Sequence, residues 1–152
     1  MYMREFTSAA PEVYQALGAI GKAAAGSGLE KGLIELVKVR ASQINGCAYC
    51  LDFHVAMARK LGVSQSQLDL LAAWRGAGAL FGAREQAALA WTEALVLLPG
   101  GGPGESERAQ VREHFNEQDF LHLTVAIGLI NQWNRINVGL GILPPEAEAP
   151  RP

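Results

Sequence analysis

The sequence predicts an all-α protein with one domain over residues 1–143, and three observations support this prediction. Apolar residues recur at intervals of three and four along most of the chain, which is the spacing of amphipathic helices. Alternating runs rich in Val, Ile and Thr, which are typical of strands, do not occur. The length of 152 residues suits one hydrophobic core and is too short for two ordinary domains.

The first three expected helices cover residues 11–25, 29–44 and 47–61. Pro11 suits the first turn of a helix, because that position needs no backbone N–H donor. Asn45 and Gly46 form a typical helix stop, so the second and third helices should make an antiparallel hairpin around them. Gly62 then closes the third helix.

The later helices are expected at residues 64–75, 83–98, 105–115 and 118–143, which gives about six to seven helices in total. Ser64 and Gln67 have the spacing of a capping box, which marks a helix start. The Gly-rich residues 99–104 read as a loop. The last helix carries only Asp119 and Arg135 as charged residues, so it must be buried, either centrally or between subunits.

Composition and charge exclude several classes of function. The 13 Lys and Arg against 15 Asp and Glu give a net charge of −2, which offers no basic surface for nucleic acid or an anionic membrane. The sequence shows no membrane span and no signal peptide, so we expect a cytoplasmic protein. Only 18% of residues are charged and 49% are hydrophobic, which predicts a homo-oligomer with a buried interface. The Pro-rich residues 144–152 are expected to form a disordered tail.

Two cysteines and a histidine carry most of the functional information. Cys47, Cys50 and His54 project within a sector of about 60° when placed on one helix. Asp52 and Arg59 lie on the opposite side, so the sulfurs and the imidazole should point inward. Unpaired N–H groups at a helix N-terminus stabilise a thiolate, and this effect is stronger at Cys47 than at Cys50. His54 follows Cys50 by one turn and can accept its proton.

Three interpretations of these residues compete. A pair of thiols can cycle between dithiol and disulfide, because a sulfenic acid on one condenses with the other. The same residues can instead belong to a non-catalytic module that senses oxidation or binds zinc, and a zinc site would need a fourth ligand or an open position. They can also be two inert helix cysteines beside a core histidine. Thiol redox chemistry is favoured, although the thioredoxin fold is excluded because no strands surround the motif.

Glu35 is the candidate for a fourth residue of this site. It precedes Asn45 by ten residues and His54 follows Asn45 by nine, so a hairpin would place the two at similar heights. A carboxylate there would orient the imidazole and relay a proton. Glu35 can equally be a solvated residue that pairs with Lys31 or Lys38, and spacing alone favours this second interpretation.

Glu35, followed after eleven residues by the Cys47-Ala-Tyr-Cys50-Leu-Asp-Phe-His54 motif, resembles the carboxymuconolactone decarboxylase superfamily, specifically its AhpD-like alkylhydroperoxidase branch. The resemblance extends over about residues 10–140 and includes residues 61–64, 71–75, 85–93 and 131–135. The resemblance implies an AhpD-like helical fold, with the motif at the start of the third helix. The decarboxylase members lack the cysteine pair, which argues against lactone decarboxylation here.

The resemblance also implies how the site works. The resemblance implies that the cysteine pair reduces hydroperoxides, with Cys50 as the peroxidatic thiol and Cys47 as the resolving thiol. His54 and Glu35 correspond to the proton relay. No bound cofactor or metal is implied, but an external dithiol, such as a small thiol or a lipoyl group, must restore the thiols. Assembly as a trimer or hexamer is expected. Some relatives carry a further His between the cysteines, where this chain has Tyr49.

The remaining candidates are expected to be structural. His114 and His122 have no Cys or acidic partner at motif spacing. Glu93 and Arg135 are candidates for an ion pair. Three tryptophans are expected to fill the core or subunit contacts: Trp74, Trp91 and Trp133.

Overall fold

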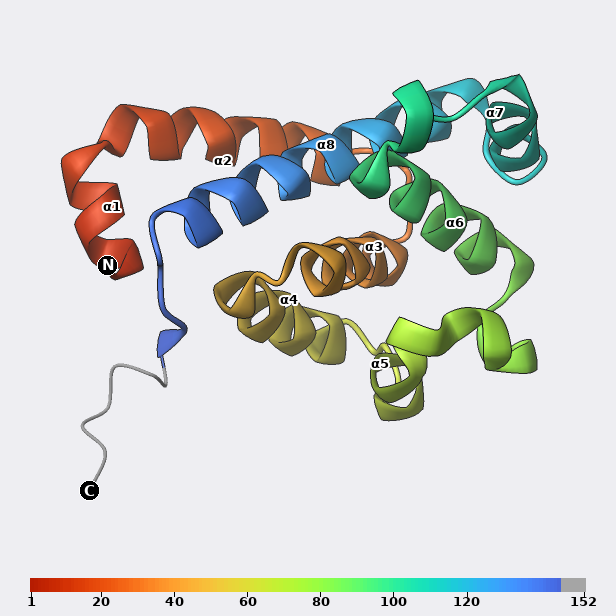
Figure 1. The fold of residues 1–152 in the computed structure, drawn as a ribbon, viewed down its shortest axis with the longest axis horizontal. Coiled ribbons are helices and arrows are strands. Elements are labelled where there is room, and N and C mark those ends of the chain that lie inside the picture. The colour runs from red at the N-terminus through yellow and green to blue at the C-terminus, as the bar shows by residue number, and fades with distance from the viewer. Residues whose placement is uncertain (146–152) are drawn as a thin grey trace.

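The computed structural model describes residues 1–145, and these residues contain eight α-helices and no strand (Figure 1). This confirms the all-α prediction. The helices are α1 (Met3–Ala9), α2 (Pro11–Ala25), α3 (Lys31–Asn45), α4 (Ala48–Lys60), α5 (Gln65–Leu70), α6 (Ala83–Leu97), α7 (Glu105–Arg112) and α8 (Glu117–Gly139). Three short 3₁₀ segments lie at Leu71–Gly76, Gly78–Leu80 and Pro99–Gly101. The expected tail, residues 144–152, lies mostly outside the described residues.

The structure differs from the expected helices at four places, one of which is the helix expected at residues 105–115, which ends at Arg112. Helix α1 was not predicted, so the cysteine motif lies on the fourth helix and not on the third. Ala10 separates α1 from α2 because a residue before proline disfavours helical backbone angles, and its φ is −137°. The helix expected at residues 64–75 becomes 3₁₀ after Leu70, with a non-helical Ala73 inside. The final helix ends at Gly139, ahead of a left-handed Gly141.

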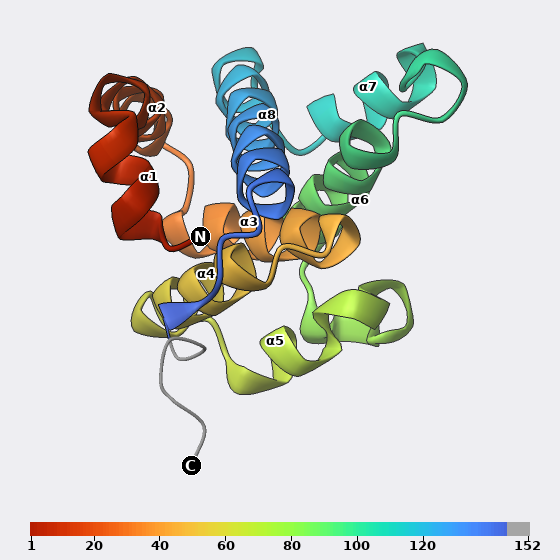
Figure 2. The same ribbon diagram turned by 60° about the vertical axis from the view of Figure 1, so that its left-hand side comes forward.

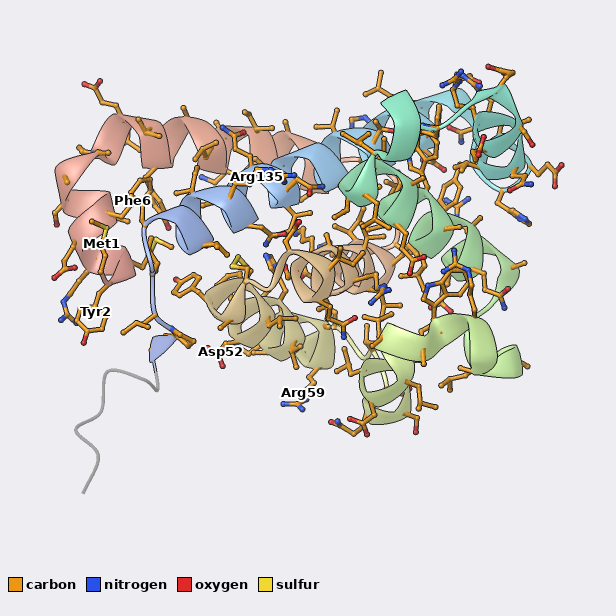
Figure 3. The ribbon with its side chains drawn as sticks, in the orientation of Figure 1. Met1, Tyr2, Phe6, Asp52, Arg59 and Arg135 are labelled. Atoms are coloured by element: carbon orange, nitrogen blue, oxygen red, sulfur yellow. A yellow bond between two sulfur atoms is a disulfide. The ribbon has the colours of Figure 1, made fainter. Side chains whose placement is uncertain are left out.

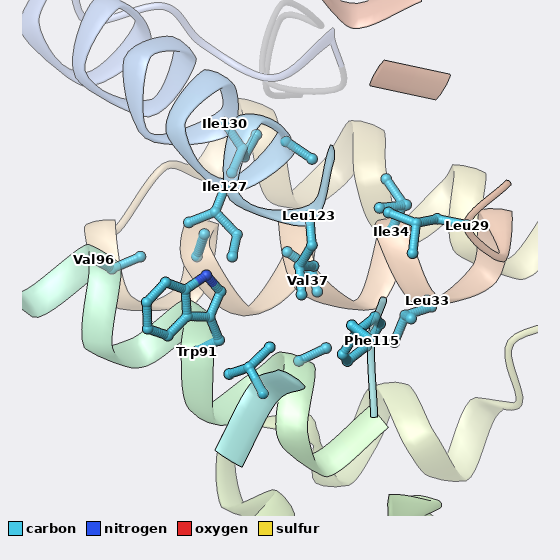
Figure 4. Packing of buried hydrophobic residues seen from close by; sticks show 14 of the residues in the cluster. Leu29, Leu33, Ile34, Val37, Trp91, Val96, Phe115, Leu123, Ile127 and Ile130 are labelled. Carbon is cyan, nitrogen blue, oxygen red and sulfur yellow. The ribbon is translucent and has the colours of Figure 1, made fainter. Parts of the chain in front are cut away.

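Helix α3 forms the centre of the domain, and α4, α6 and α8 all pack against it (Figure 2). One buried cluster joins α3 to α6 and α8 through residues such as Val37, Trp91 and Ile127 (Figure 4). A second cluster lies where α3 meets α4, α5 and the following 3₁₀ turn, and includes Leu36, Ala58 and Trp74. The apolar spacing of α3 explains this position, since it has side chains to bury on most of its circumference.

Helix α8 is only partly covered. Leu123 and Ile127 are fully buried against α3 and α6, whereas Leu121 and Val125 on its outer side are exposed. Within the single chain this helix is therefore buried on its inner side only, and the alternative of burial between subunits stays a prediction.

Helices α1 and α2 pack against the C-terminal half of α8. Phe6 and Tyr14 both make edge-on ring contacts with Trp133 of α8. The carbonyl of Met1 accepts a hydrogen bond from the backbone of Leu143, so the N-terminus lies beside the end of the described chain (Figures 1 and 3). Within residues 1–145, no helix is both long and apolar enough to cross a bilayer.

Candidate active site

The α3–α4 turn builds the cysteine site. Gly46 ends α3 with a φ of 67°, a left-handed conformation that glycine adopts without a steric cost. Cys47 then becomes the N-cap of α4, and its sulfur accepts the backbone N–H of Cys50 at 3.2 Å. The two cysteines form a disulfide, with their Cα atoms 5.3 Å apart. Their side chains are buried beneath α8, while Asp52 and Arg59 lie on the outer side of α4, as predicted (Figure 3).

His54 and Glu35 are in contact across the hairpin. Nδ1 of His54 lies 2.7 Å from Oε2 of Glu35, so the contact that the helix heights made feasible is present. The other carboxylate oxygen of Glu35 accepts a hydrogen bond from Nζ of Lys38 at 2.7 Å. Glu35 does pair with a lysine, but it is 6% exposed, so the alternative of a solvated side chain is wrong.

The environment of Glu35 favours its charged form. Burial alone would raise the pKa of this carboxyl, but the hydrogen bond from His54 and the charge of Lys38 outweigh burial and lower the pKa below 4.5. The carboxylate is therefore ionised at neutral pH and accepts a hydrogen bond from the Nδ1–H group of His54. This fixes the tautomer and leaves Nε2 of the imidazole as the nitrogen that can exchange a proton.

A cavity of about 240 Å³ opens onto this site between α1, α2, α3, α4 and α8. Its wall is mainly apolar, with side chains such as Leu17, Phe53 and Trp133. Trp133 was expected to fill the core or a subunit contact, and it also lines this cavity. The polar side chains that reach the cavity include Lys38, Cys50, His54 and Asn137. Cys50 lines the cavity, whereas Cys47 is not among its lining residues.

Asn137 is the site residue that sequence reasoning missed. Its Nδ2 donates a hydrogen bond to the sulfur of Cys50 at 3.2 Å. The available signal was a row of polar residues at intervals of three on an otherwise apolar helix: Asn131, Asn134 and Asn137. The first two bind the end of α3, because Asn45 donates to both side chains and Asn134 donates to Ser42.

The other candidate residues lie outside the cavity. The sequence suggested an ion pair between Glu93 and Arg135, but the two residues do not pair. Glu93 accepts hydrogen bonds from Arg40, Arg75 and Trp74, because α6 faces α3 and the 3₁₀ turn rather than the end of α8. Arg135 instead donates to Asn131 one turn earlier.

Neither His114 nor His122 lines the cavity. Among residues 1–145, no group of three or more His, Cys, Asp or Glu side chains is arranged to hold a metal ion.

Comparison with known proteins places this site in a family. The model of the carboxymuconolactone decarboxylase family matches residues 11–94, which include α2 to α5, most of α6 and all four predicted site residues. The uncharacterised protein YdfG of Bacillus subtilis is 35% identical over 132 residues, which cover 87% of this chain and 89% of YdfG.

Two solved structures share the fold. A crystal structure of a protein of unknown function from Agrobacterium tumefaciens, provisionally described as the antioxidant defence protein AhpD, superposes with a TM-score of 0.86. It is 38% identical, and the match covers 92% of this chain and 95% of that one. The debrominase Bmp8 superposes with a TM-score of 0.81 at 18% identity, over 93% of this chain and 75% of Bmp8, and shows the fold alone. With the family model matching more than half of its length and an AhpD-like structure covering nearly all of it, this chain belongs to the carboxymuconolactone decarboxylase family and has the AhpD-like fold.

Proposed function

We propose that this protein is a thiol-dependent peroxidase that reduces hydroperoxides through a cycle between the Cys47–Cys50 dithiol and disulfide. The observation that carries the proposal is the placement of this disulfide at an apolar cavity that is lined by Cys50 and by His54, the hydrogen-bonded partner of Glu35. The likeness to an AhpD-like antioxidant protein supports the same class of chemistry.

Cys50 is the attacking thiol in this proposal. The helix N-terminus favours a thiolate at either cysteine, but Cys50 faces the cavity and Cys47 does not. His54 removes the proton from the Cys50 thiol, and the thiolate attacks the terminal oxygen of the hydroperoxide. The O–O bond breaks, the released alkoxide takes the proton back from His54, and Cys50 is left as a sulfenic acid.

Cys47 then resolves the sulfenic acid. Its sulfur attacks the sulfur of Cys50, the S–S bond forms, and the hydroxyl group leaves as water with the proton of the Cys47 thiol. Glu35 acts throughout as the carboxylate that orients His54 and stabilises its charged form. An external dithiol then reduces the disulfide and becomes a disulfide itself.

The reductant must reach sulfurs that are almost fully buried, since Cys47 is 1% and Cys50 is 3% exposed. A small thiol or a dithiol on a slender arm, such as a lipoyl group, can enter through the cavity, whereas the active site of a folded protein cannot. A reducing compartment suits such a cycle, so the cytoplasm is the location we propose.

The test is peroxide consumption by metal-free protein with a dithiol reductant, beside the Cys50→Ser variant, with thiols counted before and after peroxide. We expect the wild type to lose two thiols per chain without the reductant and to turn over with it, and the variant to show no turnover. A different result would favour a zinc-binding module instead. In that case both proteins would be equally inactive, and the protein would contain one zinc ion per chain before the metal is removed.

A further inference from the structure

The amide of Asn137 contacts the proposed site at one end and has no partner at the other. Nδ2 donates to the sulfur of Cys50, as described above, and Oδ1 has no hydrogen-bond partner among the described residues. The side chain is 3% exposed and lines the cavity. A buried amide oxygen without a partner is unfavourable, and such groups in native proteins call for a specific explanation.

The surrounding contacts fix where this amide lies. The preceding polar residue on the same face, Asn134, is fully buried and hydrogen-bonded to Ser42 of α3. The backbone carbonyl of Asn137 accepts the N–H of Ile142 at 2.8 Å, which ties down the end of α8. These contacts set the position of α8 over α4, and the hydrogen bond to Cys50 holds the Asn137 side chain itself.

The chemistry of sulfur fixes which end of the amide faces Cys50. A thiolate accepts hydrogen bonds and donates none, so the NH₂ group must point to it once the disulfide is reduced. The carbonyl oxygen on the same amide carbon then remains as an acceptor without a partner, on a side chain that lines the cavity. A hydroperoxide carries one hydroxyl donor, on the oxygen that a thiolate attacks.

From this arrangement we propose that Asn137 is a catalytic residue whose Nδ2 stabilises the Cys50 thiolate and whose Oδ1 accepts the hydroxyl hydrogen bond of the incoming hydroperoxide. This inference rests on the proposed peroxidase function. The amide holds the terminal oxygen beside the sulfur, so the S–O bond forms as the O–O bond breaks. The hydroxyl hydrogen stays on that oxygen and becomes the hydrogen of the sulfenic acid, while His54 protonates the leaving alkoxide.

The experiment isolates Cys50 in a Cys47→Ser background, reduced and free of reductant. Two rates are measured against pH: alkylation by iodoacetamide, which needs only the thiolate, and single-turnover reaction with hydrogen peroxide or tert-butyl hydroperoxide. The variants are Asn137→Leu, which removes both ends of the amide, and Asn137→Asp, which keeps acceptor oxygens but replaces the donor. Asn131→Leu is the matched control, two turns earlier on α8 and away from the sulfur.

We expect Asn137→Leu to slow alkylation at pH 7 by about tenfold, because the thiolate loses a charge-assisted hydrogen bond. The midpoint of its pH profile should move up, and that of Asn137→Asp should move up further because of the added negative charge. At a pH above all midpoints the alkylation rates should converge. The peroxide reaction of Asn137→Leu should still be about tenfold slower than that of Asn137→Asp, because only the latter keeps an acceptor.

Several results would overturn the inference. If Asn137→Leu matches Asn131→Leu in both rates, Asn137 has no catalytic part. If alkylation slows but the two Asn137 variants react equally with peroxide at high pH, the acceptor role is wrong. A Cys50 that is alkylated normally but never reacts with peroxide would refute the peroxidase function itself, while the alkylation series would still decide the donor role. Circular dichroism and thermal unfolding establish that each variant is folded.

Discussion

Glu35 uses its two carboxylate oxygens for two different partners. One oxygen binds His54 of the next helix and the other binds Lys38 one turn away. Lys38 offsets part of the cost of burying the carboxylate, so that Glu35 stays charged beside the imidazole. A single residue thereby connects the two helices of the hairpin and holds the imidazole of His54 in place.

Replacing Glu35 with Gln should slow peroxide turnover without removing thiols. The amide cannot stabilise a charged imidazole, so we expect kcat/KM to fall by about 10- to 100-fold while the thiol count stays unchanged. Steady-state kinetics and thiol titration measure both quantities. Glu113→Gln, an exposed carboxylate outside the cavity, is the control. A Glu35→Gln enzyme as fast as the control would show that the relay needs no carboxylate.

Gly46 at the α3–α4 turn has a left-handed backbone conformation, whereas Gly128 lies within helix α8 and has no positive φ. A Cβ would meet nothing within 4 Å at either Gly46 or Gly128, but only Gly46 has a positive φ. We therefore expect Gly46→Ala to destabilise the protein by about 1 kcal/mol through backbone strain. Gly128→Ala should stabilise it by about 0.5–1 kcal/mol through helix propensity. Urea unfolding of both variants measures the difference, and equal signs would contradict this account.

Glu93 joins three elements, since its partners Arg40 and Trp74 come from α3 and from the 3₁₀ turn after α5. Burial would raise the pKa of the Glu93 carboxyl, but hydrogen bonds from Arg75, Trp74 and Arg40 lower it below 4.5. Because the folded pKa lies below the unfolded one, this carboxyl contributes its full stabilisation above about pH 4.5. That contribution is lost as the pH falls toward the folded pKa.

The Glu93→Gln variant tests this pH dependence. At pH 7 we expect the free energy of unfolding of the variant to be lower by about 2–3 kcal/mol, because two arginines lose their anionic partner. The gap in melting temperature between wild type and variant should narrow as the pH is lowered from 4.5 to 3. Thermal unfolding followed by circular dichroism gives the gap at each pH, and a gap that stays constant would show that Glu93 does not titrate as described.

The outer side of α8 is the surface through which we propose that copies of this chain assemble. Leu121 is 58% and Val125 is 40% exposed, and they lie one turn apart on the same face. Isolated apolar residues on a surface are ordinary, but a shared face on a long helix suits contact with another copy of the chain. The trimer or hexamer expected from the sequence therefore remains our proposal.

Light scattering coupled to size-exclusion chromatography tests the assembly. We expect a mass several times that of the 16.2 kDa chain, and a smaller mass for the Leu121→Glu and Val125→Glu double variant, because buried carboxylates oppose association. A wild-type protein that elutes as a 16.2 kDa monomer at micromolar concentration would refute the proposal.

The features that depend on local spacing could be predicted from the order of the residues alone. The helical class, the Gly46 stop, the shared face of Cys50 and His54 and the height of Glu35 opposite His54 all follow from 3.6 residues per turn along two adjoining helices. The short α1 escaped prediction because a helix of 7 residues gains little from propensity and depends on packing, here of Phe6 against Trp133.

Contacts between residues far apart in the chain could be found only from the folded arrangement of the helices. Asn137 reaches a sulfur 87 positions earlier in the chain, and Glu93 reaches Arg40 at a separation of 53. Such contacts depend on how α6 and α8 cross α3, which is set by the sum of many weak packing contacts and not by any one motif. The same packing created the cavity and placed Cys50, not Cys47, on its wall. Residue spacing fixes the groups along one helix or hairpin, whereas the packing of helices fixes what lies across from them.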